Sequence, residues 1–226
     1  MLTRIETYIF VPRPANGVAV SGIAGRAKQL GLPTLAQAAA LILALLALTQ
    51  PLWSITGAET SADRDTTDYV WGTRTTYEVR GGTLDKVIFQ SFTGPSFRDF
   101  KMREVVTIGF FLVSAMAAAL FVAIVVPWVS RTPLPVLTVI LAAAAAVLGF
   151  AATLYPVLTV ADAYRTDHPG DIFVAGFAGQ APPTKGVTWT WGPGGAWYLA
   201  AAGLALAALA TIVILLRFSL PRHPRP

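Results

Sequence analysis

The chain contains no cysteine among its 226 residues. Without cysteine no loop can be held by a disulfide, and thiolate sites for zinc or iron–sulfur clusters are excluded. Charged residues are also scarce, because they make up 13% of the chain, about half of the share that is usual in globular domains. Hydrophobic residues make up 54%. This balance excludes an ordinary soluble domain, which needs a charged surface.

The missing charges leave four apolar runs that contain no Asp, Glu, Lys, Arg or His. The runs are 35–53, 105–129, 134–160 and 196–216. Each reaches or nears the roughly 20 residues that a helix needs to cross a membrane. We therefore predict a transmembrane domain over 34–217, a bundle of four membrane-spanning helices. Loops 54–104 and 161–195 connect them on one side, and tails 1–33 and 218–226 lie on the other.

The first apolar run starts too late and is too long for a cleaved signal peptide. We expect it to remain as an uncleaved membrane anchor. The two long loops carry 9 Lys/Arg and 11 Asp/Glu, whereas the tails and the short turn around Arg131 carry 8 Lys/Arg and one acid. Because lysine and arginine stay on the cytoplasmic side, we expect a multi-pass protein of the plasma membrane with both termini cytoplasmic. The net charge of +5 then favours contact with anionic lipid, and no nucleic-acid-binding motif is present.

The absence of ionisable residues from the four runs also limits the function. Proton and ion paths in membranes are marked by such residues, and haem needs an axial ligand such as histidine. The sequence therefore argues against a pump, an ion-coupled transporter or a redox subunit with its own cofactor. We expect no enzyme activity, no cofactor and no metal.

The two long loops are rich in residues that favour strands. In the first loop, 69–79 and 84–92 flank the Gly81–Gly82 turn and predict a hairpin. In the second loop, Val187, Trp189 and Trp191 alternate with threonines, which predicts a strand with one aromatic face. Since an isolated hairpin is marginal in water, we expect one small extracellular β-sheet built from both loops.

Several aromatic and small residues are predicted to carry structure or contacts. Trp53 is the last residue of the first run and is expected to pack under the sheet. Ser96 to Asp99 predicts a capped helix that places Phe97 and Phe100 on one face. Glycine, alanine and threonine recur every fourth residue in the last two runs, a spacing that allows close helix contact inside the bundle or with a partner. The candidate contact residues are Trp53, Trp71, Trp189, Trp191, Trp197, Gly149, Gly203 and Ala207.

Two groups of polar residues are weaker candidates for an ion site. Asp63, Asp65 and Asp68 supply oxygen ligands suited to calcium but lack the rest of an EF-hand loop. His168 lies near Asp167 and Asp171, a composition that is common in solvated loops. We expect both groups to be solvated loop residues.

The layout resembles that of the claudin and peripheral myelin protein superfamily. The similar stretches are "PLW" at the end of the first run, "YVWG" around Trp71, "DKVIFQSF" and "FRDFKMRE" before the second run, and the glycine-rich aromatic entry to the fourth. The paired loop cysteines of that family are absent. The resemblance implies a non-enzymatic protein that acts by lateral and extracellular contacts with membrane proteins.

Two functions therefore fit the sequence. The first is an interaction protein, a scaffold or adhesion molecule, whose partner is itself or another integral membrane protein. The alternative is a small accessory subunit of a larger respiratory, transport or cell-envelope complex, since such a subunit also carries no chemistry of its own. A pore or transporter acting alone is disfavoured, because the runs offer no polar path.

Overall fold

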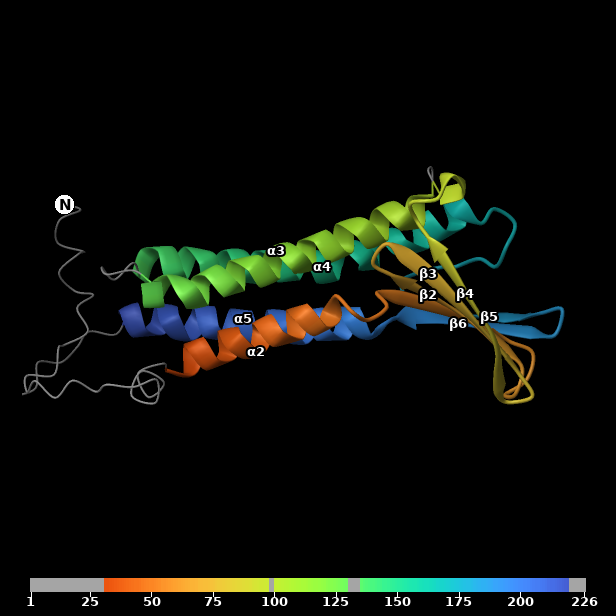
Figure 1. Cartoon of the computed structure of the whole chain (residues 1–226), viewed down its shortest axis with the longest axis horizontal. Helices are drawn as coiled ribbons and strands as arrows, with labels where there is room; N and C mark the ends of the chain where they lie inside the picture. Colours follow the sequence, from red (N-terminus) through yellow and green to blue (C-terminus); the bar gives the residue numbers. More distant parts are fainter. Residues whose placement is uncertain (1–30, 98–99, 130–134, 220–226) are drawn as a thin grey trace, which may run out of the picture.

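The computed structural model describes residues 31–97, 100–129 and 135–219. A bundle of helices carries a β-sheet at one end, which we call the sheet end (Figure 1). In chain order the elements are α2 (Leu32–Ala47), β1 (Trp53–Ala58), β2 (Arg64–Val70), β3 (Thr73–Arg80), β4 (Thr83–Ser91), η2 (Pro95–Phe97), α3 (Lys101–Val129), α4 (Pro135–Asp167), β5 (Gly179–Thr184), β6 (Val187–Pro193) and α5 (Gly195–Ser219). The turn around Arg131 and most of both tails lie outside the described residues.

Three of the helices, α3, α4 and α5, are long and apolar enough to cross a membrane, which indicates a membrane protein. The helix α2 is apolar but has 16 residues, about 24 Å at the rise of an α-helix. The prediction that this helix runs to Trp53 was wrong, because it ends at Ala47. Pro51 cannot continue a helix, and the hydroxyl of Thr49 donates to the carbonyl of Leu46 (2.8 Å) at the turn.

The other helices are longer than their charge-free runs. Helix α3 begins at Lys101, α4 continues to Asp167, and α5 begins at Gly195. Two carboxylate oxygens of Asp167 accept the backbone N–H groups of Lys101 and Met102, both at 2.7 Å. The end of α4 therefore caps the start of α3, where a helix has unpaired N–H groups and favours negative charge.

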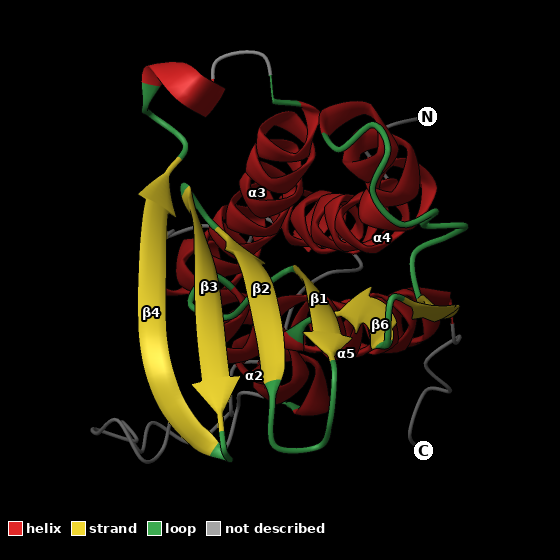
Figure 2. Cartoon of the chain, turned by 90° about the vertical axis from the view of Figure 1, so that its right-hand side faces the viewer, coloured by secondary structure: helices red, strands yellow, loops and turns green. Residues whose placement is uncertain are grey.

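The sheet is antiparallel and has six strands in the order β4-β3-β2-β1-β6-β5. The first loop supplies four strands and the second supplies two, and the loops join where β1 pairs with β6. This confirms the prediction that both loops build one sheet. Figure 2, viewed along the bundle, shows β2, β3 and β4 lying across the ends of the helices, with β4 at the edge of the sheet and β6 on the opposite side. The strands β5 and β6 run nearly along the bundle (Figure 1).

The predicted hairpin is present as β3 and β4, and both Gly81 and Gly82 adopt the positive φ that the turn requires. The interpretation of 69–79 as one strand was wrong, because a turn at Trp71–Gly72 divides it between β2 and β3. Gly72 has φ of 75°, a conformation that glycine adopts without strain.

The aspartates expected in a loop were also misplaced, because Asp65 and Asp68 lie within β2. The adjacent β-branched Thr66 and Thr67 favour a strand. The helix expected to begin at Ser96 is a single 3₁₀ turn, and Asp99 lies outside the described residues.

The helices associate as two pairs, α3 with α4 and α2 with α5, which make the most extensive helix contacts (Figure 1). Each pair is joined at the sheet end. The carboxylate of Asp167 links the first pair, and the ladder between β1 and β6 links the second. The main buried core, which the helices share with the sheet, consists mostly of alanine, valine and aromatic side chains.

Candidate contact surfaces

Trp53 lies at the junction of sheet and helices and is fully buried (0% exposed). Its ring packs against Tyr69 of β2 and Tyr164 of α4, each with centroids 5.6 Å apart. Its indole N–H donates to the carbonyl of Phe177 at 2.7 Å. A tryptophan needs such an acceptor when it is buried. Trp53 is therefore a core residue that joins the sheet, α4 and the second loop.

Two further tryptophans tie separate segments together through their indole N–H groups. Trp191 is buried and donates to the carbonyl of Gly176 (3.0 Å) in the second loop. Trp197 of α5 donates to the carbonyl of Thr153 in α4 (2.9 Å). Both tryptophans are thus committed to contacts inside the molecule.

Trp189 and Trp71 are less enclosed. Trp189 lies over Gly57 of β1, where an added Cβ would meet its ring at 2.7 Å. Trp71 is 46% exposed and stacks on Phe110 of α3, with centroids 5.8 Å apart and planes 5° apart. Of the five candidate tryptophans, Trp71 offers the largest free surface.

The small-residue stripes lie inside the bundle. A Cβ at Gly203 would approach the backbone carbonyl of Ala40 in α2 at 3.3 Å, and one at Gly149 would approach the sulfur of Met116 in α3 at 2.9 Å. Ala207 is fully buried. Of the two roles that the spacing allows, the structure places these residues in helix contacts within the chain.

A cluster of apolar side chains lies on the sheet face that turns away from the helices. Residues directly opposite in an antiparallel sheet share a face, and faces alternate along each strand. Trp53 and Tyr69 lie on the face toward the helices, so the other face carries the set that we call the outer-face patch. Its members are Tyr77 and Val79 of β3 and Leu84, Val87 and Phe89 of β4.

The outer-face patch is open to solvent at its β4 side, where Leu84 is 59% exposed and Phe89 is 73% exposed. No contact role was predicted for these residues. The sequence did contain a signal for an apolar face, because Val87 and Phe89 are two residues apart and therefore fall on one face of the predicted hairpin. Because large apolar side chains in a group mark contact sites, we add this patch to the candidates.

The two edges of the sheet differ in their capacity to pair. The edge strand β4 has nine residues and no proline, whereas β5 contains Pro182 and Pro183. Proline has no backbone N–H to donate and protects an edge against pairing. Within the described residues no strand pairs with the outer side of β4. This edge is therefore a template for another strand.

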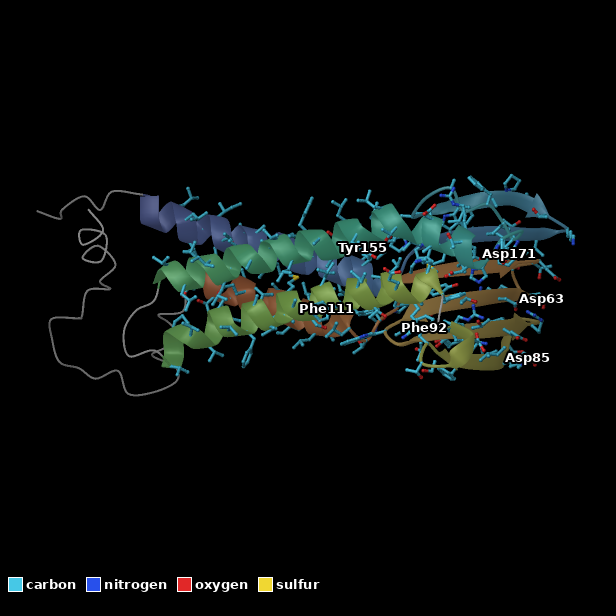
Figure 3. The ribbon with its side chains drawn as sticks, turned by 90° about the horizontal axis from the view of Figure 1, so that it is seen from above. Asp63, Asp85, Phe92, Phe111, Tyr155 and Asp171 are labelled. Atoms are coloured by element: carbon cyan, nitrogen blue, oxygen red, sulfur yellow. The ribbon has the colours of Figure 1, made fainter. Side chains whose placement is uncertain are left out.

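The acidic candidates have structural partners. A carboxylate oxygen of Asp63 accepts the backbone N–H of Gly81 (2.8 Å) and the other accepts the hydroxyl of Thr60 (3.2 Å), and these bonds lower the pKa of Asp63 below its ordinary value. Asp65 pairs with Arg80 at 2.7 Å. Figure 3 shows Asp63 and Asp85 at the far end of the sheet.

The acids at this end do not converge on a metal site. The described residues contain no group of three or more His, Asp or Glu side chains arranged to hold a metal ion. His168 stacks on Tyr164 with centroids 4.4 Å apart and lies edge-on to Phe100. It is a packing residue at the end of α4.

Comparisons of the chain with protein-family models and with curated proteins found no match.

Proposed function

We propose that the protein is a non-enzymatic membrane protein that associates laterally with a second copy of itself through the open edge of β4. The observation that carries this proposal is the open β4 edge with the outer-face patch beside it. Main-chain hydrogen bonds of an added strand supply affinity, and the side chains beside the edge supply specificity.

The geometry of an edge strand restricts how two copies can pair. Outward backbone groups occur at every second residue of an edge strand. Because the two β4 strands are identical, the same residues direct these groups outward in both copies. The numbers of two residues that lie opposite each other in an antiparallel pair therefore differ by an even number. The twofold axis is then perpendicular to the sheet. Because β4 and the strands beside it lie across the end of the bundle (Figure 2), this axis runs roughly along the bundle, and both copies lie in one membrane.

Charge and hydrophobicity favour one register. Centring the axis on Lys86 would place two lysines opposite each other, and centring it on Val87 would place Lys86 opposite Ile88. Centring it on Ile88 pairs Ile88 with itself, Val87 with Phe89, and Lys86 with Gln90. Apolar cross-strand pairs stabilise a sheet, and opposed like charges destabilise it. This register also extends the outer-face patch across both copies.

The test uses the absence of cysteine from the chain. A single Ile88→Cys substitution should give a disulfide-linked dimer in oxidised membranes, because Cα atoms opposite in an antiparallel pair are about 4.5–5.5 Å apart and a disulfide spans about 4.4–6.8 Å. The measurement is the fraction of covalent dimer on a denaturing gel. Lys86→Cys is the matched control, because its two copies would lie about 14 Å apart along the strand.

The register centred on Ile88 predicts a second crosslinking result. A mixture of Lys86→Cys and Gln90→Cys chains should crosslink, although Lys86→Cys alone should not. Self-crosslinking of Lys86→Cys without that of Ile88→Cys would contradict the register. A different protein that co-purifies in equal amounts, with no Ile88→Cys dimer, would overturn self-association and favour the accessory-subunit function.

We also propose a cellular location, a membrane orientation and a family for the protein. We propose that the protein is multi-pass in the plasma membrane, that α2 crosses it as a fourth span with both termini cytoplasmic, and that the sheet is extracellular. The charge difference between loops and tails supports this orientation. The similarity to the claudin superfamily remains part of this proposal, since a protein of that kind acts by contact. Protease accessibility of the β5–β6 turn in intact cells tests the orientation.

A further inference from the structure

An apolar groove lies between α2 and α3 on the side of the bundle. Its volume is about 280 Å³. The helix α2 contributes two leucines and the residue that follows it contributes a third, and α3 contributes three small residues and a phenylalanine. The lining residues are Leu41, Leu45, Leu48, Ser114, Ala117, Ala118 and Phe121. The groove thus extends over residues 41–48 and 114–121, about 10 Å or two helical turns.

The groove exists because small side chains form its floor. Ser114, Ala117 and Ala118 do not fill the space in front of the α2 leucines, and the contact between α2 and α3 is less extensive than that of α2 with α5 or α3 with α4. The pairing of the helices thus leaves a seam between the pairs. A polar binding site would present hydrogen-bonding groups in such a seam.

The lining offers no such group. The hydroxyl of Ser114 donates to the backbone carbonyl of Phe110 at 2.9 Å, and the other lining side chains are apolar. No residue of the lining carries a charge. The occupant must therefore be apolar along its whole length, because a polar group placed there without a partner would be costly.

The shape of the groove excludes a helix from a neighbouring protein. Phe111 and Phe121 flank the floor on the same side of α3 and are 69% and 56% exposed; Figure 3 labels Phe111 on this helix. With its side chains a helix is about 10–12 Å wide, so these two rings hold a straight helix away from Ala118. A flexible chain can bend past them.

We propose that this groove binds one acyl chain of a phospholipid from the leaflet at the sheet end. The position of Trp71 identifies the leaflet. Its ring stacks on Phe110, one helical turn beyond Ser114 toward the sheet, and tryptophan favours the membrane–water interface. The headgroup then lies beside Trp71 and the acyl chain runs down the groove. The groove is independent of the β4 edge, so this inference stands without the proposed function.

The test fills the groove and counts lipids. The protein is reconstituted in dioleoylphosphatidylcholine vesicles, extracted in mild detergent and analysed by native mass spectrometry. Wild type should retain one phosphatidylcholine per chain, and Ala118→Phe should reduce that occupancy at least tenfold. The control is Ala202→Phe on α5, which is exposed and adjoins Gly203, near Leu43 of α2. It should keep the lipid.

Each outcome decides the proposal. Equal retention by wild type and Ala118→Phe, or no retention by wild type, overturns it. Loss of a dimer in Ala118→Phe with an unchanged lipid count shows that a protein side chain fills the groove instead. Retention of added oleate but not of phosphatidylcholine assigns the groove to a free fatty acid and overturns the phospholipid. Ala118→Leu, a smaller filling, repeats the measurement if the phenylalanine variant does not fold.

Discussion

The two edges of the sheet come from different loops and have opposite properties. The edge strand β4 comes from the first loop, has no proline and presents Phe89 to solvent. The edge strand β5 comes from the second loop and has two prolines and a register irregularity beside them. Sheets in monomers protect both edges. We therefore expect association at the unprotected β4 edge.

The largest expected effect comes from the middle of the sheet, which holds both edges on the helices. Trp53→Ala should lower the free energy of unfolding by roughly 3–5 kcal/mol, because it removes a fully buried aromatic side chain and leaves the carbonyl of Phe177 without its donor. Thermal unfolding in detergent measures the loss. Trp71→Ala is the control, since Trp71 is half exposed, and an equal loss for both variants would contradict the argument.

The next effect distinguishes the roles of the two sheet edges in self-association. Phe89→Lys should weaken self-association roughly 10- to 100-fold, because the burial of a phenylalanine contributes about 1.5–3 kcal/mol and tenfold corresponds to about 1.4 kcal/mol. Energy transfer between labelled chains in vesicles reports the dissociation constant. Thr184→Lys places the same charge on β5 and should leave association unchanged. A similar weakening by both variants would show that the edges are equivalent.

A smaller effect is the pH dependence of stability that Tyr69 of β2 causes. Burial raises the pKa of the Tyr69 phenol. An acid whose folded pKa is raised contributes stability that is complete below its unfolded pKa, about 10, and is lost as pH rises above that value. Wild type should therefore lose about 1.4 kcal/mol per pH unit above pH 10 from this residue. Tyr69→Phe should have a shallower alkaline slope in chemical unfolding, and an unchanged slope would contradict this assignment.

The smallest expected effect is a gain of association at the protected edge. Replacing both Pro182 and Pro183 by threonine restores two backbone N–H groups in β5. We expect a few-fold increase in higher oligomers, because an open edge at each end of the sheet allows chains of molecules to form. Light scattering in detergent measures the size. An unchanged size would show that the prolines do not limit pairing at this edge.

The arrangement of helices and sheet was largely predictable from the sequence. The charge-free runs located α3, α4 and α5, and the alternation of Val187, Trp189 and Trp191 located β6. The burial of Trp53 under the sheet was also predicted and is confirmed. In each case a periodic or uninterrupted pattern extends over several residues and points to one structure.

The errors occurred where a boundary depends on distant residues. The apolar run does not change in composition at Ala47, so it concealed the end of α2, which the pairing of β1 with both neighbouring strands fixes. Ser96 gave a capping signal, but Asp167 performs the capping 66 residues away from Lys101. The outer-face patch was missed because exposure depends on which face of the sheet the helices cover. That choice is made by tertiary packing.

The cap from Asp167 also has a consequence for biosynthesis. The capping carboxylate leaves the ribosome 66 residues after the first residue of α3. At about 5–20 residues per second the delay is roughly 3–13 s. The strand β1 waits longer, until β6 is translated. The nascent chain must therefore keep the first turn of α3 uncapped and β1 without its second partner strand until then. Chaperones have access to the unfinished sheet during this interval.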